Sequence, residues 1–406
     1  MQFHVAITRE SGAEQAAQAL VASVREAFGR TAPDLVCLFF SPHYANTSGE
    51  LAETLHRQLA PRVMVGCMGE GVIGPSEEYE NASVVSLWAA QLPAARMVPL
   101  HLTFHEQETQ SSYLLEGWPR ELESLSDRPT FLVFADPFST PIEHVFEKME
   151  ERCPGAPAIG GIASGGTDLG ENRLVFNGTI VKEGLVGVAL WGPVWIRTLV
   201  SQGCQPIGER YVVTKAERNI MYELGGVPTL ERLQETLQRL GPERGKQVAM
   251  AVQVGVAFDE QRERFDRGDF LIRGLLGADQ RSGGLAISDI VKEGQTVQFH
   301  VRDPMAASED FNLLLAQDRR DYPNSPLKGA LLFSCNGRGR RFFAEPNHDI
   351  SALQRQAEGI PVAGFFAAGE IGPVGGKNFI HGYTASVALF AEPFPDEECR
   401  GRVPEK

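Results

Sequence analysis

The sequence predicts an α/β protein with mixed β-sheets, in which two related halves repeat a strand–helix–strand–strand unit and helices pack on the sheets. Short apolar stretches with strand character alternate with helical stretches in which apolar residues recur every three or four positions. The order and spacing of these elements near the N-terminus return near the C-terminus. Some strands follow one another too closely for the long crossover of a parallel pair, so the sheets are expected to be mixed.

The first copy of the repeat begins at the N-terminus and ends near residue 90. An expected strand at 2–8 precedes a helix at 12–28, whose apolar residues lie on one face. A Gly- and Pro-rich loop is expected to end at Pro75. The remaining elements of this copy are strands at 35–40, 63–67 and 83–90 and a helix at 49–59.

A second full copy is expected from Gln298, because residues 298–301 repeat the Gln-Phe-His-Val of residues 2–5. Its expected elements are strands at 298–304, 330–335, 362–366 and 383–391, helices at 306–317 and 349–359, and a loop to Pro373. A partial third copy at 130–192 has a strand, a helix, a Gly-rich segment and a final hairpin. The three copies share one order: strand, helix, Gly-rich strand end, strand.

The section between the copies, 195–297, is rich in strand-like stretches and has one expected helix at 228–240. Glycine and proline cluster at 193–206, which favours a boundary there. We therefore expect two domains, residues 1–200 and residues 201–406.

The composition excludes several classes of protein. The net charge is -14 and no dense Lys/Arg run occurs, which argues against nucleic-acid binding. No stretch approaches the ~18 apolar residues of a membrane span, and the N-terminus lacks the pattern of a signal peptide. The six cysteines are scattered and form no Cys-x-x-Cys pair. We expect a cytoplasmic protein that binds neither nucleic acid nor membranes.

The familiar cofactor and catalytic motifs are missing. The sequence has no Walker A loop, no Gly-x-Gly-x-x-Gly after the first strand and no Gly-x-Ser-x-Gly elbow. The histidines do not cluster with cysteines as zinc ligands do. The Gly-rich residues 160–166 leave phosphate binding open, beside the structural interpretation that glycine permits close backbone packing. We expect no cofactor and no metal, and we assign no catalytic residue.

Polar and charged residues follow the apolar strand at 331–335. Cys335, Asn336, Arg338 and Arg340 lie where α/β sheets commonly bind ligands, after the carboxyl end of a strand. A nearby guanidinium would lower the pKa of Cys335 and make it a better nucleophile, and a catalytic pair would then need His348 or His381. The alternative is a buried cysteine that acts as a small apolar residue.

Two further groups complete the candidate ligand-binding residues. His300 and Arg302 share one strand face, where Arg302 either forms a surface ion pair or holds a ligand carboxylate. The glycine-rich loops 66–75 and 364–373 share their first glycine and a final Ile-Gly-Pro. Such a repeated pattern is first a feature of the fold. Each loop carries one glutamate, Glu70 or Glu370, which either caps backbone amides or faces a ligand.

Several long segments together resemble the FIST family (F-box and intracellular signal transduction). The segments at 63–75 and 83–88 are similar to its N-terminal domain, that at 203–226 to its junction, and those at 268–303, 331–341 and 364–373 to its C-terminal domain. The resemblance covers about residues 30–395. It implies that residues 1–200 form a FIST N-terminal domain and residues 201–406 a FIST C-terminal domain, without an F-box.

The resemblance implies a sensory or signal-transduction role and supplies no catalytic residues. The leading hypothesis is a cytoplasmic module that binds a small ligand, such as an amino acid, and not an enzyme. Its candidate ligand-binding residues are Cys335, Asn336, Arg338, Arg340, Glu370, Arg302, His381 and Glu70. Two alternatives remain: a protein-interaction scaffold that recruits a signalling partner without any ligand, and an enzyme that uses Cys335.

Overall fold

The computed structural model describes residues 1–107, 112–123, 125–262, 265 and 267–392. Two compact units are present. Of the described residues, unit 1 contains those within 1–200, 312–380 and 384–392, and unit 2 contains those within 201–311 and 381–383. The α/β class with mixed sheets is confirmed. The expected division into 1–200 and 201–406 stays a prediction.

Unit 1 holds three mixed sheets, and each is built around one pair of parallel strands. The first sheet has the order β1-β6-β2-β3-β11-β12. Its parallel pair is β2 and β3, and its other pairs are antiparallel. The bounds are β1 Gln2–Thr8, β6 Val85–Gln91, β2 Leu35–Phe40, β3 Val63–Met68, β11 Leu174–Phe176 and β12 Thr179–Val181.

The second sheet has the order β25-β24-β10-β9-β13-β7-β8, with β10 and β9 parallel. The third has the order β14-β26-β22-β23-β4-β5, with β22 and β23 parallel. The bounds in the second sheet are β25 Lys377–His381, β24 Glu370–Val374, β10 Ala158–Ile162, β9 Thr130–Ala135, β13 Leu185–Trp191, β7 Arg96–Gln107 and β8 Ser112–Glu116. Those in the third are β14 Trp195–Gln202, β26 Thr384–Ala391, β22 Leu327–Cys335, β23 Val362–Ala367, β4 Gly71–Ile73 and β5 Glu78–Glu80.

The three copies exchange their hairpins in a ring. The hairpin β4–β5 of the first copy completes the third sheet, and β11–β12 of the middle copy completes the first. The hairpin β24–β25 of the last copy completes the second sheet. The expected loops up to Pro75 and Pro373 are therefore wrong in part, because each contains a strand that pairs with another copy.

The expected second copy begins in the wrong place. Residues 298–301 lie in β21 (Thr296–Arg302), which pairs with strands of unit 2 and not with β26. In the third sheet β14 occupies the edge that β1 occupies in the first. The four-letter identity is thus a local similarity, because the pairing partners decide the position of a strand.

Equivalent residues of the three copies meet in the core. In each copy, one residue of the first parallel strand pairs with the first glycine of the second parallel strand, and a phenylalanine comes directly after that residue. These phenylalanines are Phe39, Phe134 and Phe333. Their ring centroids lie 5.4 to 6.3 Å apart in edge-to-face geometry. Phe365 contacts all three at 5.3 to 6.0 Å. Aromatic pairs in this geometry each contribute about 1 kcal/mol beyond the burial of their area.

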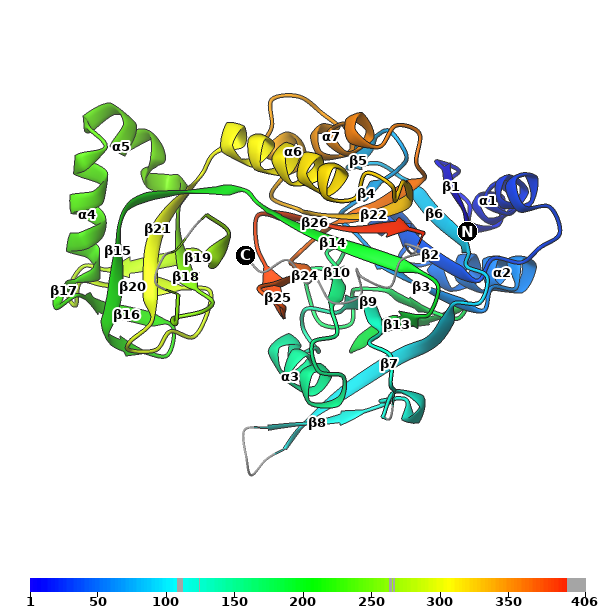
Figure 1. Cartoon of the computed structure of the whole chain (residues 1–406), viewed down its shortest axis with the longest axis horizontal. Coiled ribbons are helices and arrows are strands. Elements are labelled where there is room, and N and C mark those ends of the chain that lie inside the picture. The colour runs from blue at the N-terminus through cyan, green and yellow to red at the C-terminus, as the bar shows by residue number, and fades with distance from the viewer. Residues whose placement is uncertain (108–111, 124, 263–264, 266, 393–406) are drawn as a thin grey trace. The chain divides into compact units, whose positions relative to one another are not determined.

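The helices of unit 1 cover the outer faces of its sheets. Apolar side chains of α1 and α2 form one cluster with Val36, Leu38 and Phe40 of β2, and both helices lie beside the first sheet in Figure 1. The apolar side of α3 packs on the second sheet. The bounds are α1 Ala13–Phe28, α2 Ser48–Leu59, α3 Ile142–Arg152, α6 Pro304–Asp321 and α7 His348–Gln356, where α6 begins in unit 2.

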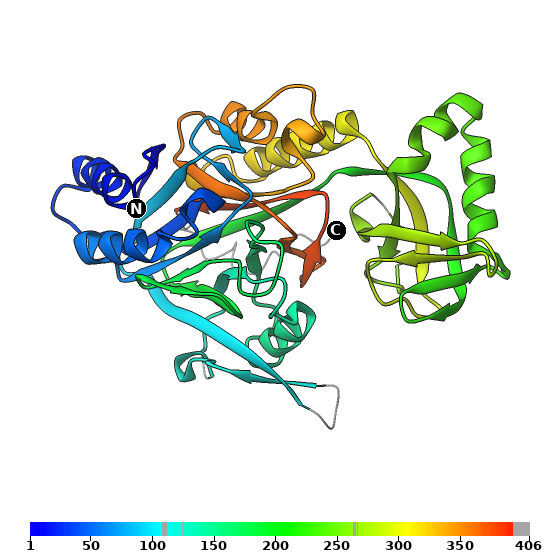
Figure 2. The ribbon, with the colours of Figure 1, turned by 180° about the vertical axis from the view of Figure 1, so that it is seen from behind.

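Unit 2 is a closed antiparallel barrel. Its strands pair in the order β15-β21-β18-β19-β20-β16, and β16 pairs with β15 to close the ring. The strand β17 adds to β16, and the helices α4 and α5 belong to the same unit, as Figure 2 shows. The bounds are β15 Cys204–Glu217, β18 Val252–Ala257, β19 Phe270–Asp279, β20 Gly284–Ile287, β16 Ile220–Leu224, β17 Val227–Pro228, α4 Thr229–Arg239 and α5 Pro242–Val248.

The structure also bears on membrane insertion. Among the helices of the described residues, none combines the length and the hydropathy that a membrane span requires.

The close approach of strands in unit 1 predicts that Gly364→Ala destabilises the protein. A Cβ atom at this position would lie 1.7 Å from the Leu332 carbonyl oxygen of β22, so the parallel pair would have to separate. We expect a loss of unfolding free energy of about 3 kcal/mol, in the range of severe core substitutions.

The matched control is Gly49→Ala in helix α2, where a Cβ meets nothing within 4 Å. Alanine is the better helix former there by about 1 kcal/mol, so this variant should be as stable as the wild type or slightly more stable. Urea unfolding of both variants tests the contrast. Equal midpoints for Gly364→Ala and the wild type would contradict the role of this glycine.

Candidate functional site

The polar and glycine-rich loops of the three copies converge in unit 1. The Ser164 hydroxyl accepts a hydrogen bond from the Glu70 amide at 2.8 Å and donates one to the Phe366 carbonyl. The Asn336 amide donates to the Ala367 carbonyl at 2.8 Å. The loops are therefore joined mainly through backbone groups, and Ser164 connects all three copies.

The most buried charged cluster lies beside these loops. Arg338 is fully buried and makes a bidentate pair with Asp349 on α7, with nitrogen–oxygen distances of 2.8 and 2.7 Å. The Ser334 hydroxyl donates to the same carboxylate at 2.6 Å, and His348 Nδ1 lies 2.9 Å from it. The Phe343 ring lies 5.0 Å from the guanidinium. This arrangement holds Arg338 within the fold.

The charges of this pair stabilise each other. Burial alone would raise the pKa of Asp349, but the Arg338 guanidinium holds it well below its usual range. Burial would likewise lower the pKa of Arg338, and the Asp349 carboxylate raises it instead. Both groups therefore stay ionised, and the guanidinium already has the planar carboxylate partner that a ligand would otherwise supply.

Glu370 is a second buried carboxyl of this cluster. It is 0% exposed and accepts hydrogen bonds from the Thr384 amide at 3.1 Å and the Thr384 hydroxyl at 2.8 Å. Burial raises the pKa of Glu370 to about 8, although Thr384, the Arg338 charge and the Cys335 thiol oppose the increase. At neutral pH Glu370 is mostly protonated, so it caps Thr384 and does not present a charge.

Glu78 is a buried carboxylate that the sequence analysis missed. It lies on the exchanged hairpin strand β5 and accepts the Asp349 and Ile350 amides at the start of α7, both at 2.9 Å. Burial, together with the Asp349 charge, raises the pKa of Glu78 to about 7. A carboxylate at a helix N-terminus is stabilised by the exposed amides, but no local pattern places residue 78 beside residue 349.

The surface edge of the converging loops, which we call the rim, is exposed to solvent but contains almost no cavity volume for a ligand. Glu70 pairs with Arg341, whose guanidinium also donates to the Asn336 carbonyl at 3.4 Å. The side chain of Arg340 is exposed, and its backbone amide donates to Glu80 at 2.9 Å. The hollow at Glu70, Asn336 and Arg341 measures about 10 Å³. That volume is about the minimum that holds one water molecule.

The candidate residues thus fall into two groups in different units. Cys335, Arg338 and Glu370 are buried together in unit 1. Arg302 and His381 belong to unit 2, where the Arg302 guanidinium lies 4.4 Å from the Tyr383 ring and His381 is 3% exposed. That these residues bind a ligand stays a prediction.

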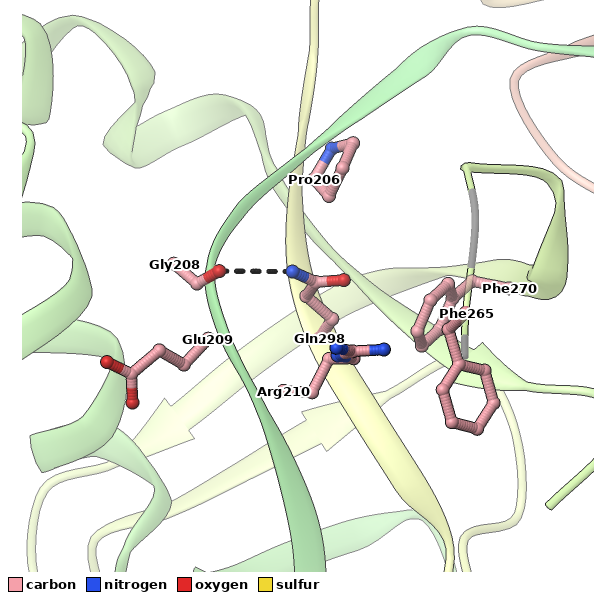
Figure 3. A pocket seen from close by; sticks show the side chains of 7 residues that line it. All are labelled: Pro206, Gly208, Glu209, Arg210, Phe265, Phe270 and Gln298. Atoms are coloured by element: carbon pink, nitrogen blue, oxygen red, sulfur yellow. Dashed lines mark hydrogen bonds between the residues drawn. The ribbon is translucent and has the colours of Figure 1, made fainter. Parts of the chain in front are cut away.

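A much larger pocket lies in unit 2, over strands β15 and β21. It measures about 610 Å³, within the range of small-molecule sites. Figure 3 shows its lining, and we call it the β15–β21 pocket. Its lining residues are Pro206, Gly208, Glu209, Arg210, Phe265, Phe270 and Gln298.

A bulge in β15 shapes this pocket. Ile207 pairs with Phe299 and Arg210 pairs with Gln298, so Gly208 and the next residue have no partner in β21. Gly208 has φ +68°, which only glycine adopts without strain. The Gln298 amide nitrogen donates to the Gly208 carbonyl at 3.0 Å and fixes the bulge.

Arg210 and Gln298 are not among the site residues predicted from the sequence. Arg210 lies in the section 195–297 that the sequence predicts to be rich in strands, but a bulge depends on the partner strand and cannot be located from one strand alone. One signal in the sequence points to Gln298: it shares its strand face with His300 and with the predicted site residue Arg302. As for metal sites, no group of three His, Cys, Asp or Glu side chains with suitable geometry occurs among the described residues.

The buried pair predicts a large effect of Arg338→Leu on stability. This variant leaves the Asp349 carboxylate buried without its counter-ion, which costs about 3–5 kcal/mol of unfolding free energy. The control is Arg341→Gln at the rim, where the pair with Glu70 is partly exposed and contributes less than about 1 kcal/mol. Urea denaturation measures both. A small effect of Arg338→Leu would refute the structural role of the pair.

The raised pKa of Glu370 predicts that stability decreases with increasing pH. Between about 4.5 and about 8, the unfolded chain has released a proton that the folded chain still holds at Glu370. The carboxyl therefore lowers the unfolding free energy by up to about 1.4 kcal/mol per pH unit in this window. Glu370→Gln removes this contribution, so its stability advantage over the wild type should grow from pH 5 to pH 8. Parallel pH profiles in urea denaturation would contradict the assignment.

Comparison with known proteins identifies the family. Residues 34–227 match the FIST N domain and residues 229–373 match the FIST C domain. An uncharacterized protein of Mycobacterium tuberculosis is 38% identical over 392 residues, which cover 97% of this chain and 100% of the relative. An uncharacterized protein of Mycobacterium bovis is 36% identical over 97% of this chain and 99% of its own length. The chain belongs to the FIST family.

Proposed function

We propose that this FIST protein is a sensory module that binds a small molecule in the β15–β21 pocket of unit 2. The observation that carries the proposal is the volume of this pocket, about 610 Å³, together with two charged, one amide and two aromatic side chains among its lining residues. Sites for small molecules typically combine apolar walls with a few polar groups that orient the ligand.

The cluster around Arg338 gives less support to ligand binding. Its guanidinium is engaged by Asp349 and its Glu370 carboxyl is held by Thr384. The adjacent hollow of about 10 Å³ is too small for an amino acid. We therefore assign these groups to the stability of the fold.

The alternative of an enzyme with Cys335 as nucleophile has weaker support, because this cysteine is only 5% exposed. A scaffold that recruits a signalling protein is the other alternative. The scaffold alternative requires no ligand pocket. A screen for ligand binding therefore distinguishes it from the sensory proposal.

A thermal-shift screen of a broad panel of metabolites at millimolar concentration tests the proposal. A ligand at 100 times its Kd adds about 2.7 kcal/mol to the unfolding free energy, which raises Tm by several degrees. The shift should be reduced in Arg210→Gln and retained in Arg341→Gln, which alters the rim of unit 1 instead.

Two results would contradict the proposal. One is the absence of any shift across the panel, and the other is a shift that Arg341→Gln abolishes and Arg210→Gln leaves unchanged. The scaffold alternative would gain support from the first result if the chain also captures one stable protein partner.

A further inference from the structure

The charges around the β15–β21 pocket restrict the ligand that it can hold. Glu209 is the acidic lining residue, and it pairs with Arg239 at 2.8 Å. Figure 3 shows Glu209 on the opposite side of β15 from Arg210. Asp269, close to the pocket in sequence, pairs with Arg262 at 2.6 Å. Within the described residues no carboxylate forms an ion pair with Arg210.

Arg210 is oriented by an aromatic ring. Its guanidinium carbon lies 5.5 Å from the centroid of the Phe265 ring, and Phe265 lies 5.5 Å from Phe270. A guanidinium is planar through its own delocalised bonding, the ring beside it limits its orientations, and its fork of donors matches a carboxylate. The pocket therefore combines one cation with an aromatic wall of two rings (Figure 3).

Gln298 adds an acceptor of known orientation. Its amide nitrogen donates to the Gly208 carbonyl, so the nitrogen and oxygen of the amide cannot be exchanged. Its oxygen lies on the side of Phe270, as Figure 3 shows. A ligand with a hydroxyl or N–H on its ring could donate to this oxygen.

We infer that the ligand is an aromatic monocarboxylate, an inference that rests on the proposed function of the pocket. The carboxylate binds Arg210, the ring packs against Phe265 and Phe270, and a ring hydroxyl or N–H donates to the Gln298 oxygen. An amino acid fits less well, because its ammonium group would approach Arg210 while the acidic lining residue already pairs with Arg239.

Three compounds with the same ring test the ligand class: 3-(4-hydroxyphenyl)propanoate, its neutral amide and L-tyrosine. Titration calorimetry with the full chain should give the tightest binding for the propanoate. Arg210→Gln should weaken it about 10- to 100-fold, as expected for a charge-assisted hydrogen-bonded pair. Arg210→Lys keeps the positive charge but loses the planar fork of donors, so its affinity for the propanoate should lie between those of the wild type and Arg210→Gln. Phe265→Leu should weaken all compounds that bind through the ring.

The control variant is Arg341→Gln at the rim of unit 1, outside the β15–β21 pocket, which should change the affinity less than about 2-fold. If L-tyrosine or the amide binds as tightly as the propanoate or more tightly, and Phe265→Leu still weakens that binding, the ligand class is overturned. The β15–β21 pocket then remains the binding site. Binding of the propanoate that Arg210→Gln does not weaken would also overturn it. If none of the three compounds binds and the panel compound that does bind is not an aromatic monocarboxylate, the ligand class alone is overturned. If no compound of the whole panel binds, the proposed function is overturned as well.

Discussion

The fold of unit 1 depends on the close contact of two parallel strands at one glycine in each sheet. A Cβ atom at Gly66, Gly160 or Gly364 would lie 1.7 to 1.9 Å from a carbonyl oxygen of the parallel neighbour. Each of these glycines also pairs with the exchanged hairpin from another copy. A side chain here would therefore disturb both the parallel pair and the connection between copies. The phenylalanine cluster lies one residue further along and fills the space that the three sheets enclose.

The exchange explains why so many polar groups near the loops serve the structure. The hairpin β4–β5 pairs with the sheet of another copy and is held there by further contacts. Glu78 supplies one of them by capping the first amides of α7. The same helix carries Asp349, which holds Arg338. Buried charges are tolerated only when they are paired and hydrogen-bonded. A buried arginine with such partners is consequently poor evidence for ligand binding, even at the carboxyl end of a strand.

The sequence was sufficient for most local structure and insufficient for long-range pairing. The helix at 13–28 follows from apolar periodicity and the strand at 35–40 from a continuous apolar run, and both signals are properties of neighbouring residues. The exchanged strand at 71–73 looked like a loop, because it is short, glycine-rich and paired only with a distant strand. For the same reason, the identity of residues 2–5 and 298–301 predicted equivalent strands that belong to different sheets. The β15–β21 pocket was missed because its bulge exists only relative to β21.

Two arginines of this chain show how the environment decides the use of a side chain. Arg338 and Arg210 carry the same planar fork, which binds carboxylates well. Arg338 is fully buried, so an unpaired charge there would lower the unfolding free energy by several kcal/mol. The ion pair with Asp349 is therefore a permanent part of the fold. Arg210 is exposed and keeps its charge hydrated without a carboxylate, while Phe265 limits its orientations. A binding site requires a charged group that is stable without the ligand and that still gains favourable interaction energy when the ligand binds. Arg210 meets both conditions, whereas Arg338 is already paired with Asp349 and has nothing to gain from a ligand carboxylate.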